Sequence, residues 1–387
     1  KTLLITQHFP PHPGGAQNLY YQLCEHMNAE DIVVLADDSH NEEYAHLMRE
    51  FEYPVHYRSF YFKHLWPKWM LLLQHTMKIA REEGVQMLWA GEPLPKGVVA
   101  SIASKLLGMP YFVTTHGADV LNPLQRPGLK GIWKKTLLTS VLTHAKFITA
   151  NSKYTRSIVE SLGVPREKIV VVYPTAQNTP PAPAQATDTV IQKIAGLKQR
   201  GKKIVLGVSR VVMRKGIDVM LEAMQQVVKQ MPEAVYVVFG GGPALETLKE
   251  KAHTLGITDH VVFTGALSDD SLKKAYELAD VFAMVPREEQ GLIEGFGIVY
   301  AEAGGFGKPV IGSHVGGVPE AVVGYTGDNG DTATGIIIDD PRDAEALSRA
   351  LVTLLDNEKL SEQLGENGRT FARKFSWEKG VQDITSY

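Results

Sequence analysis

The chain has 387 residues, of which 44% are hydrophobic and 21% are charged, and its formal net charge is −3. This length predicts two domains of roughly 100–200 residues each. The near-neutral balance, without long blocks of like charge, argues against a nucleic-acid-binding protein. No apolar run approaches the roughly 20 residues that cross a bilayer. The N-terminal segment does not read as a signal peptide, and the single cysteine, Cys24, fits a reducing compartment, so we expect a cytoplasmic protein.

Short apolar segments alternate with helical stretches through the first half of the chain. The predicted strands are 3–6, 32–36, 87–90, 111–115, 147–150 and 169–173, with helices near 16–27, 98–107 and 153–162. Strands that alternate with helices predict a parallel sheet covered on both faces.

A segment rich in proline, alanine and threonine then predicts a linker, after which the same alternation restarts. The second series of strands is 204–208, 235–239, 261–264, 281–285, 310–312 and 336–338. We therefore predict two doubly wound α/β domains. Their ranges are 1–175 and 191–375, with a linker at 176–190 and a closing helix at 376–387. Ligands of such domains bind at the carboxyl ends of the strands, and we expect the site in the cleft between the domains.

Two strand ends of the first half carry candidate binding residues. Gly14 and Gly15 precede a helix whose free amides would suit a phosphate. The G-x-G-x-x-G pattern of dinucleotide-binding enzymes is absent. His116 ends a strand and precedes a glycine, where an imidazole can bind a ligand or handle a proton. His8 and His12 rank lower, and Asp119 reads more simply as a helix cap.

The first strand of the second half ends before Arg210 and Lys215. A planar guanidinium and an ammonium at such a loop can bind a diphosphate, with Arg214 as a nearby alternative. The triple glycine 240–242 permits close approach of a ligand, although it also suits an ordinary turn.

Two glutamates flank a glycine-rich turn in the segment EGFGIVYAEAGGFGKPVI. On one continuous helix, Glu294 and Glu302 would stand roughly 12 Å apart, too far for a close acid–base pair. We instead place Glu294 in a loop, Gly295–Gly297 at a turn, and Glu302 about one turn into a helix that starts at Ile298. The amides of 295–298 would then face an anion. Carboxylates on either side of it would accept hydrogen bonds from hydroxyl-rich rings, as in a nucleotide-sugar.

These residues resemble the retaining glycosyltransferase family 4. The resemblance rests on Glu294, seven intervening residues and Glu302, followed by Gly-Lys-Pro-Val-Ile at 307–311 and Gly-Gly-Val-Pro-Glu at 316–320. Gly14-Gly15, His116-Gly117, Arg210 and Lys215-Gly216 match the family in order. The resemblance implies the GT-B fold, two Rossmann-like domains that face a central cleft, with the donor mainly on the second. It also implies that the last helix crosses back to the first domain and that no metal or other cofactor is needed.

The resemblance also implies roles for single residues. Glu302 would bind the nucleotide ribose, and Glu294 would contact the hydroxyls of the donor sugar. Arg210 and Lys215 would bind the diphosphate, Gly15 would let the donor phosphate approach, and His116 would contact the sugar near the reacting face. The catalytic set is thus His116, Arg210, Lys215 and Glu294. The donor-binding set is Gly14, Gly15, Arg210, Lys215, Gly295, Phe296, Gly297, Ile298 and Glu302. Fixed cations and amides would stabilise the charge that develops on the leaving phosphate.

The stretch IEGFGIVYAEA is most similar to mannosyltransferases that act on phosphatidylinositol mannosides and bacterial exopolysaccharides. That likeness favours GDP-mannose as donor and a role in cell-envelope or polysaccharide biosynthesis, with UDP-glucose or UDP-N-acetylglucosamine as alternatives. The acid pairs of the chain sit in turn-like contexts and do not predict a metal site. Gly304-Gly305-Phe306 departs from the family pattern and reads as a packing variation.

Other functions fit the sequence less well. A nucleotide-sugar epimerase of the same fold would need acids around the sugar C2, and no such set stands out. A non-catalytic binder would not need the whole set of candidate residues, and the missing fingerprint argues against a dinucleotide-dependent oxidoreductase.

The first domain is expected to hold a glycan or lipid-linked acceptor. Two of its segments, 60–78 and 126–135, mix tryptophan with lysine or arginine beside apolar residues, as interfacial helices do. We expect Lys68, Lys130, Lys134 and Lys135 to form a basic rim for an anionic membrane surface at the inner face of the cell membrane. The alternative is that Trp69–Leu73 simply begins a core helix.

Overall fold

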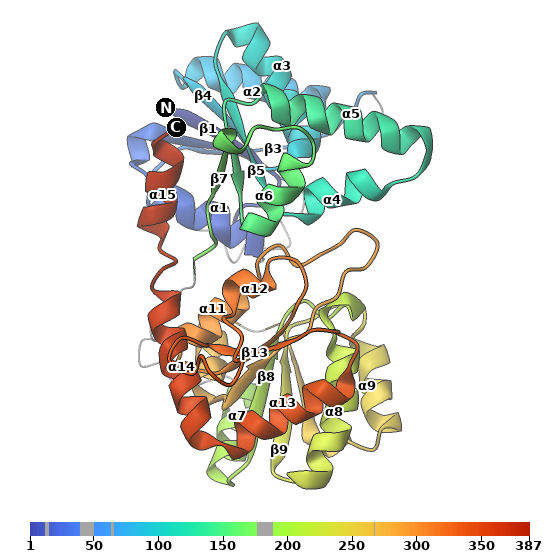
Figure 1. The fold of residues 1–387 in the computed structure, drawn as a ribbon. Coiled ribbons are helices and arrows are strands. Elements are labelled where there is room, and N and C mark those ends of the chain that lie inside the picture. Colours follow the sequence, from blue (N-terminus) through green and yellow to red (C-terminus); the bar gives the residue numbers. More distant parts are fainter. Residues whose placement is uncertain (12–14, 39–49, 63–65, 176–188, 267) are drawn as a thin grey trace. The chain divides into compact units, whose positions relative to one another are not determined.

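The computed structural model describes residues 1–11, 15–38, 50–62, 66–175, 189–266 and 268–387. The chain divides into two compact units (Figure 1). Unit 1 comprises Lys1–Pro174 together with Ser376–Tyr387, and unit 2 comprises Thr175–Phe375. Residues 176–188 of the predicted linker lie outside the described residues, and its last two residues, Thr189 and Val190, begin a helix.

Within the described residues, unit 1 contains a seven-stranded parallel sheet in the order β3-β2-β1-β4-β5-β6-β7. The strands are β1 (Thr2–Thr6), β2 (Ile32–Asp37), β3 (Val55–Arg58), β4 (Met87–Ala90), β5 (Tyr111–Thr115), β6 (Ile148–Ala150) and β7 (Ile169–Val171). The helices are α1 (Gly15–Glu25), α2 (Met70–Glu82), α3 (Val98–Leu107), α4 (Ala118–Gln125), α5 (Gly128–His144), α6 (Lys153–Glu160) and α15 (Trp377–Thr385). Burial of the strands on both faces explains their near-continuous apolar runs.

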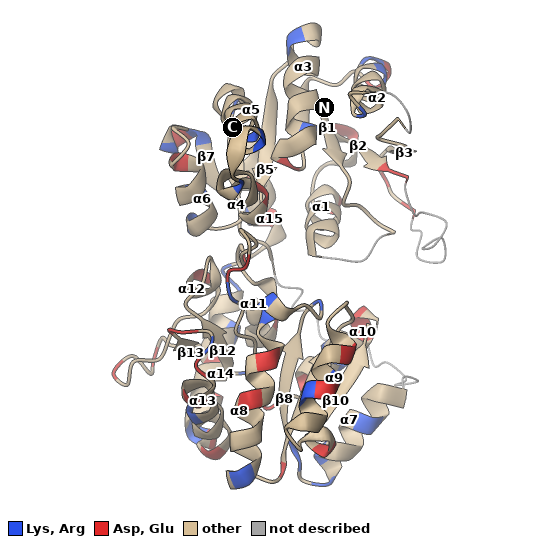
Figure 2. Ribbon diagram, turned by 90° about the vertical axis from the view of Figure 1, so that its right-hand side faces the viewer, with Lys and Arg blue, Asp and Glu red and all other residues tan. Residues whose placement is uncertain are grey.

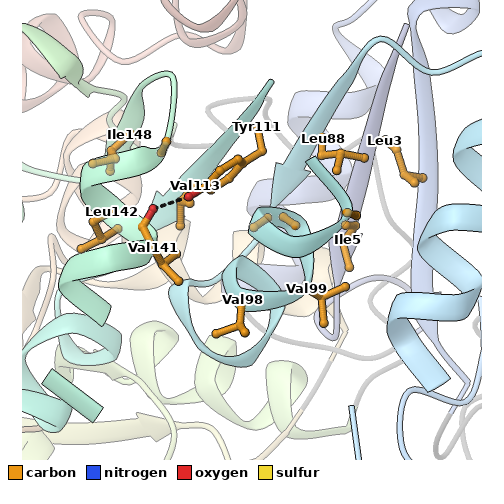
Figure 3. Packing of buried hydrophobic residues seen from close by; sticks show 14 of the residues in the cluster. Leu3, Ile5, Leu88, Val98, Val99, Tyr111, Val113, Val141, Leu142 and Ile148 are labelled. Carbon is orange, nitrogen blue, oxygen red and sulfur yellow. Dashed lines mark hydrogen bonds between the residues drawn. The ribbon is translucent and has the colours of Figure 1, made fainter. Parts of the chain in front are cut away.

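The core of unit 1 is built from side chains of the central strands and of the helices that cover them. Figure 3 shows Val141 and Leu142 of α5 packed beside Val113 of β5, where the Tyr111 hydroxyl donates to the Val141 carbonyl at 2.6 Å. On the other face of the sheet, Trp377 of α15 is buried with Tyr20 and Leu23 of α1. The C-terminal helix is therefore part of unit 1.

Unit 2 contains a six-stranded parallel sheet in the order β10-β9-β8-β11-β12-β13. The strands are β8 (Lys203–Val208), β9 (Ala234–Phe239), β10 (Val261–Gly265), β11 (Val281–Ala283), β12 (Val310–Ser313) and β13 (Gly335–Ile338). The helices are α7 (Thr189–Gln199), α8 (Ile217–Gln230), α9 (Leu245–Thr254), α10 (Asp269–Leu278), α11 (Ile298–Gly305), α12 (Val318–Ala321), α13 (Ala344–Asp356) and α14 (Glu358–Ala372). The predicted fold class, two α/β units with parallel sheets, is confirmed.

Glycines let α14 approach α11 closely. A Cβ atom on Gly365 would stand 2.1 Å from the carbonyl oxygen of Gly307, and one on Gly368 would stand 3.0 Å from the Cα atom of Gly304. Gly304, where the sequence departs from the family pattern, therefore lies at a helix contact, as the packing interpretation expected. This contact fixes α11, which begins with Ile298 and carries Glu302.

We predict that Gly365→Ala lowers the free energy of unfolding by about 1–3 kcal/mol, because the added methyl group overpacks the contact of α14 with the backbone of Gly307, directly after α11. Gly196→Ala in α7 is the matched control, since its Cβ atom would meet only the end of the Arg200 side chain at 3.5 Å. There the helix propensity of alanine should raise stability by up to about 1 kcal/mol. Thermal unfolding measures both changes, and equal effects would contradict the tight contact.

Candidate active site

The candidate residues of unit 2 lie at the carboxyl edge of its sheet. Arg210 and Lys215 follow β8, and Glu294 lies between β11 and α11. Because β8 and β11 are neighbouring parallel strands, their carboxyl ends bring these two loops together.

Lys215 and Glu294 form an ion pair in which the ammonium donates to Oε2 of the carboxylate. The Lys215 side chain is 12% exposed and that of Glu294 15%, so water screens the pair weakly. Nη1 of Arg214 lies 4.0 Å from the same carboxylate oxygen. The structure therefore places Arg214 beside Glu294 as a second cation, whereas Arg210 is exposed to solvent.

The motif Gly316-Gly317 positions Glu294 through the backbone. A Cβ atom on Gly316 would stand 2.1 Å from the carbonyl oxygen of Glu294, and one on Gly317 would stand 2.0 Å from that of Gly295. The Gly317 amide donates to the Glu294 carbonyl at 3.0 Å. Only glycine permits this approach, so Gly316 and Gly317 support the loop that carries the Glu294 carboxylate.

Glycines also support the loop of the cations. Gly216, at φ +75°, lies where a Cβ atom would stand 2.1 Å from the Val285 carbonyl oxygen. A Cβ atom on Gly240 would stand 2.0 Å from the carbonyl oxygen of Ser209, the residue before Arg210. The triple glycine thus makes a backbone contact behind the loop of Arg210.

A second ion pair fastens this loop, and the sequence analysis did not find it. Arg287 donates to both carboxylate oxygens of Asp218, at 2.8 and 3.1 Å, and its amide donates to the Arg214 carbonyl at 2.8 Å. Bidentate guanidinium–carboxylate pairs fix geometry strongly. Arg287 lies 69 positions from Asp218 in the sequence, so no local pattern predicts the pairing.

Helix α11 begins as predicted. Gly297, at φ +87°, is its N-cap, Phe296 is buried, and Ile298 is the first helical residue. Glu302 lies in the second turn of the helix, where Oε2 accepts a hydrogen bond from the Tyr276 hydroxyl at 2.9 Å. Burial raises the pKa of the Glu302 carboxyl, and the hydrogen bond from Tyr276 offsets that effect only in part.

Phe306 supports the same carboxylate indirectly. Its ring stacks on Tyr276, with centroids 5.4 Å apart and an interplanar angle of 15°. This departure from the family pattern therefore packs against the tyrosine that donates to Glu302.

His116 and Gly15 belong to unit 1, and Gly14 lies outside the described residues. Nε2 of His116 lies 2.7 Å from the hydroxyl oxygen of Tyr20, which in turn donates to the Gly91 carbonyl. Asp119 does not cap α4 as expected, because the N-cap is Gly117, at φ +92°, and the carboxylate accepts from the His116 amide at 2.9 Å. Burial raises the pKa of the Asp119 carboxyl, although nearby His116 opposes the rise.

Unit 1 also holds a charged cluster that the sequence analysis missed. Nζ of Lys96 donates to Glu92 at 2.6 Å and to Gln7 at 3.0 Å, and the second oxygen of Glu92 lies 2.6 Å from Nε2 of His8. In the sequence, only the four-residue spacing of Glu92 and Lys96 points to this ion pair. The same spacing is typical of exposed pairs on a helix, so it does not predict a buried cluster. In the described part of the chain, no three or more His, Cys, Asp or Glu side chains are arranged to hold a metal ion.

Comparisons with known proteins show the family of the chain. The family described as Glycosyltransferase Family 4 matches residues 13–176, and that described as Glycosyl transferases group 1 matches residues 190–371. The chain is 30% identical over 382 residues to the GDP-mannose-dependent alpha-(1-6)-phosphatidylinositol monomannoside mannosyltransferase of Mycolicibacterium smegmatis, covering 96% of this chain and 93% of the relative. The chain belongs to glycosyltransferase family 4.

Two further proteins match this glycosyltransferase over its full length. A monoacylated alpha-(1-6)-phosphatidylinositol monomannoside mannosyltransferase of Corynebacterium glutamicum, also GDP-mannose-dependent, is 30% identical and covers 100% of this chain and 97% of its own. The crystal structure of Anabaena HepE in complex with UDP-glucose superposes with a TM-score of 0.78, at 19% identity over 100% of this chain and 98% of that one. The fold of this glycosyltransferase is therefore GT-B.

We predict opposite effects of removing the two partners of the central ion pair. Lys215→Ala should weaken GDP binding about 10- to 100-fold, the loss expected for a hydrogen bond to a charged group. Glu294→Ala should keep or strengthen GDP binding, because Lys215 loses its competing partner, while kcat falls about 100-fold. Calorimetry and initial rates measure these changes.

The matched control is the pair of Lys251 and Glu222, which links α9 to α8 at 2.5 Å and is more exposed. Its double alanine variant should change neither GDP affinity nor kcat. Loss of GDP binding in Glu294→Ala would show that the carboxylate supports the nucleotide site itself.

Proposed function

We propose that this glycosyltransferase moves mannose from GDP-mannose to a glycan or glycolipid acceptor, with retention of the anomeric configuration, in cell-envelope or polysaccharide biosynthesis. The observation that carries the donor assignment is the near-full-length likeness to two GDP-mannose-dependent mannosyltransferases. The paired Lys215 and Glu294, with Glu302 on the helix that follows the Glu294 loop, support donor binding by unit 2.

We propose for each residue the role that the resemblance to the family implies and that its chemistry permits. Lys215 and exposed Arg210 would bind the diphosphate, and the amides at the start of α11 would add fixed partial positive charge. Glu294 would accept hydrogen bonds from sugar hydroxyls, and Glu302 from the ribose. In unit 1, Gly15 would approach the donor phosphate and His116 the donor sugar.

The proposed transfer occurs on one face of the sugar. The bond between the anomeric carbon and the phosphate oxygen breaks as the acceptor oxygen bonds to the same carbon from the same side. The proton of the acceptor hydroxyl passes to the departing phosphate oxygen. Fixed cations stabilise this leaving group more in the transition state than in the ground state, so the proposal includes no metal.

Calorimetric titration with GDP, UDP and ADP in the presence of EDTA tests the donor assignment. We expect GDP to bind at least about tenfold more tightly than the others, equivalent to about 1.4 kcal/mol. Preference for UDP would replace mannose by a UDP-linked sugar, and binding only after metal addition would contradict the metal-free site. Proton NMR of the first product should show the α-anomer, and a β-linked product would exclude retention.

We also propose that unit 1 docks on an anionic membrane surface through the N-terminal half of α5. At roughly 100° per residue, Leu129, Ile132 and Trp133 share one side of this helix. These three side chains are 84%, 63% and 63% exposed. Buried Leu138 and Leu142 lie on the opposite side, in the core. Figure 1 shows the N-terminal half of α5 extending away from the sheet.

Lysines flank the exposed apolar side of α5. At the same angle per residue, Lys130 lies on one flank and Lys135 on the other, whereas Lys134 lies further round, towards the side of Leu138; Figure 2 marks basic residues in blue. An apolar stripe between lysines suits the interface of an anionic bilayer. The segment 60–78 differs, because one face of α2, with Leu72 and Thr76, is buried, although Trp66 is 86% exposed. Among the described residues, no helix combines the length and apolarity needed to span a bilayer.

Co-sedimentation with vesicles tests the docking. The wild type should bind phosphatidylcholine vesicles that contain phosphatidylglycerol, and Lys130→Glu with Lys134→Glu and Lys135→Glu should weaken binding about tenfold or more, given about 1 kcal/mol per lysine. Ile132→Ser with Trp133→Ser should also weaken it, whereas Leu106→Ser, at a 60% exposed position of α3, is the matched control. Equal binding by all variants would exclude this face.

A further inference from the structure

The charged cluster of unit 1 lies where its sheet reverses its winding order. The strand order places β2 and β3 on one side of β1, and β4 to β7 on the other. Loops after β1 and β4 therefore diverge, and a ligand crevice forms at this point in doubly wound sheets. Gln7 and His8 follow β1, and Glu92 and Lys96 follow β4.

Lys96 sits too deep to reach a ligand. Its side chain is 2% exposed, and its ammonium group donates to Glu92 and Gln7. Burial alone would raise the pKa of the Glu92 carboxyl, but the hydrogen bond from His8 and the charge of Lys96 lower it to about 2. Lys96 thus keeps Glu92 ionised. A buried ion pair is weak evidence for stability, since apolar residues often replace such pairs without loss.

Glu92 in turn orients His8. One carboxylate oxygen lies 2.6 Å from Nε2 of His8, and Nδ1 lies 3.2 Å from the Gln17 amide nitrogen. In the neutral tautomer that carries its proton on Nε2, this proton faces the carboxylate and Nδ1 is a hydrogen-bond acceptor. The His8 side chain is 37% exposed and that of Glu92 15%, so the cluster presents the imidazole to a ligand.

The other strand-end histidine has a different environment. His116 is held by the hydroxyl of Tyr20, a neutral and buried group. His8 has an ionised partner, which makes its imidazole the stronger hydrogen-bond acceptor of the two. Such a group suits the hydroxyl of a sugar.

We infer that His8 is a specificity residue for the acceptor, whose sugar hydroxyl donates to Nδ1 in place of Gln17, with Glu92 and Lys96 as positioning residues. This inference rests on the proposed function, in which unit 1 binds a glycan acceptor. It assigns acceptor recognition to the switch point of the sheet.

The test compares variants with GDP-mannose as donor and octyl α-D-mannoside as acceptor probe. His8→Ala should raise the KM for the mannoside about tenfold, as for loss of about 1.4 kcal/mol, with a smaller change in kcat. His8→Asn, which keeps an acceptor atom near the position of Nδ1, should recover part of the loss. GDP affinity, measured by calorimetry, should stay within twofold in every variant.

Glu92→Gln combined with Lys96→Met tests positioning without leaving a buried charge unpaired. This variant should fold and raise the mannoside KM about three- to tenfold, because the imidazole loses its ionised partner. His144→Ala is the matched control, since this histidine of unit 1 is exposed and its Nδ1 lies 2.8 Å from the Ser140 carbonyl oxygen of its own helix.

An unchanged mannoside KM in His8→Ala, or a parallel loss of GDP affinity, would overturn the assignment. A wild type that binds GDP but does not glycosylate the mannoside would overturn the mannosylated acceptor and this inference with it, while leaving the donor site intact. A wild type that binds UDP instead would count against the proposed donor alone, because His8 is then tested with the matching UDP-sugar.

Discussion

The ion pair of Lys215 and Glu294 is the interaction around which the site of unit 2 is built. Its partners come from loops after two neighbouring strands, and each loop is fixed from behind. Glycines at 216 and 240 close the cation loop against carbonyl groups, and Gly316 with Gly317 do the same for the carboxylate loop. Arg287 joins the first turn of α8 to Arg214. The pair can therefore hold its geometry without burying either side chain completely, which leaves both open to a ligand.

Helix α11 carries the second carboxylate, that of Glu302, and close packing against α14 fixes this helix. Its backbone approaches α14 at Gly304, as does Gly307 directly after the helix, and its Glu302 accepts from a tyrosine that Phe306 stacks against. A larger residue at Gly304 would move the helix, whereas a different ring partner would move Tyr276. Residues 304–306 therefore act together on Glu302: Gly304 fixes the helix through its contact with α14, and Phe306 fixes Tyr276 through the ring stack.

Much of the fold follows from local sequence patterns, because apolar runs buried in a parallel sheet are visible without tertiary information. The predicted strand 111–115 matches β5, and the predicted start of α11 at Ile298 matches the structure. Strand β3 escaped prediction because Val-His-Tyr-Arg has no apolar run, and it lies at an edge where burial is incomplete. Pairs such as Arg287 with Asp218, or His8 with Glu92, join residues far apart in sequence. They depend on strand order, which local patterns do not encode.

In the site of unit 2 the ammonium group of Lys215 is paired with Glu294, and this pairing has a consequence for the proposed donor. A diphosphate that binds Lys215 competes with Glu294 for the same ammonium group. If the phosphate takes over the lysine, Glu294 keeps only the longer contact with Arg214 and would become available to sugar hydroxyls. Nucleotide binding and sugar binding are then coupled through one side chain, so an intact nucleotide-sugar gains an interaction that neither half makes alone. Such coupling favours the complete donor over the released nucleotide and spends binding energy where the anomeric bond must break.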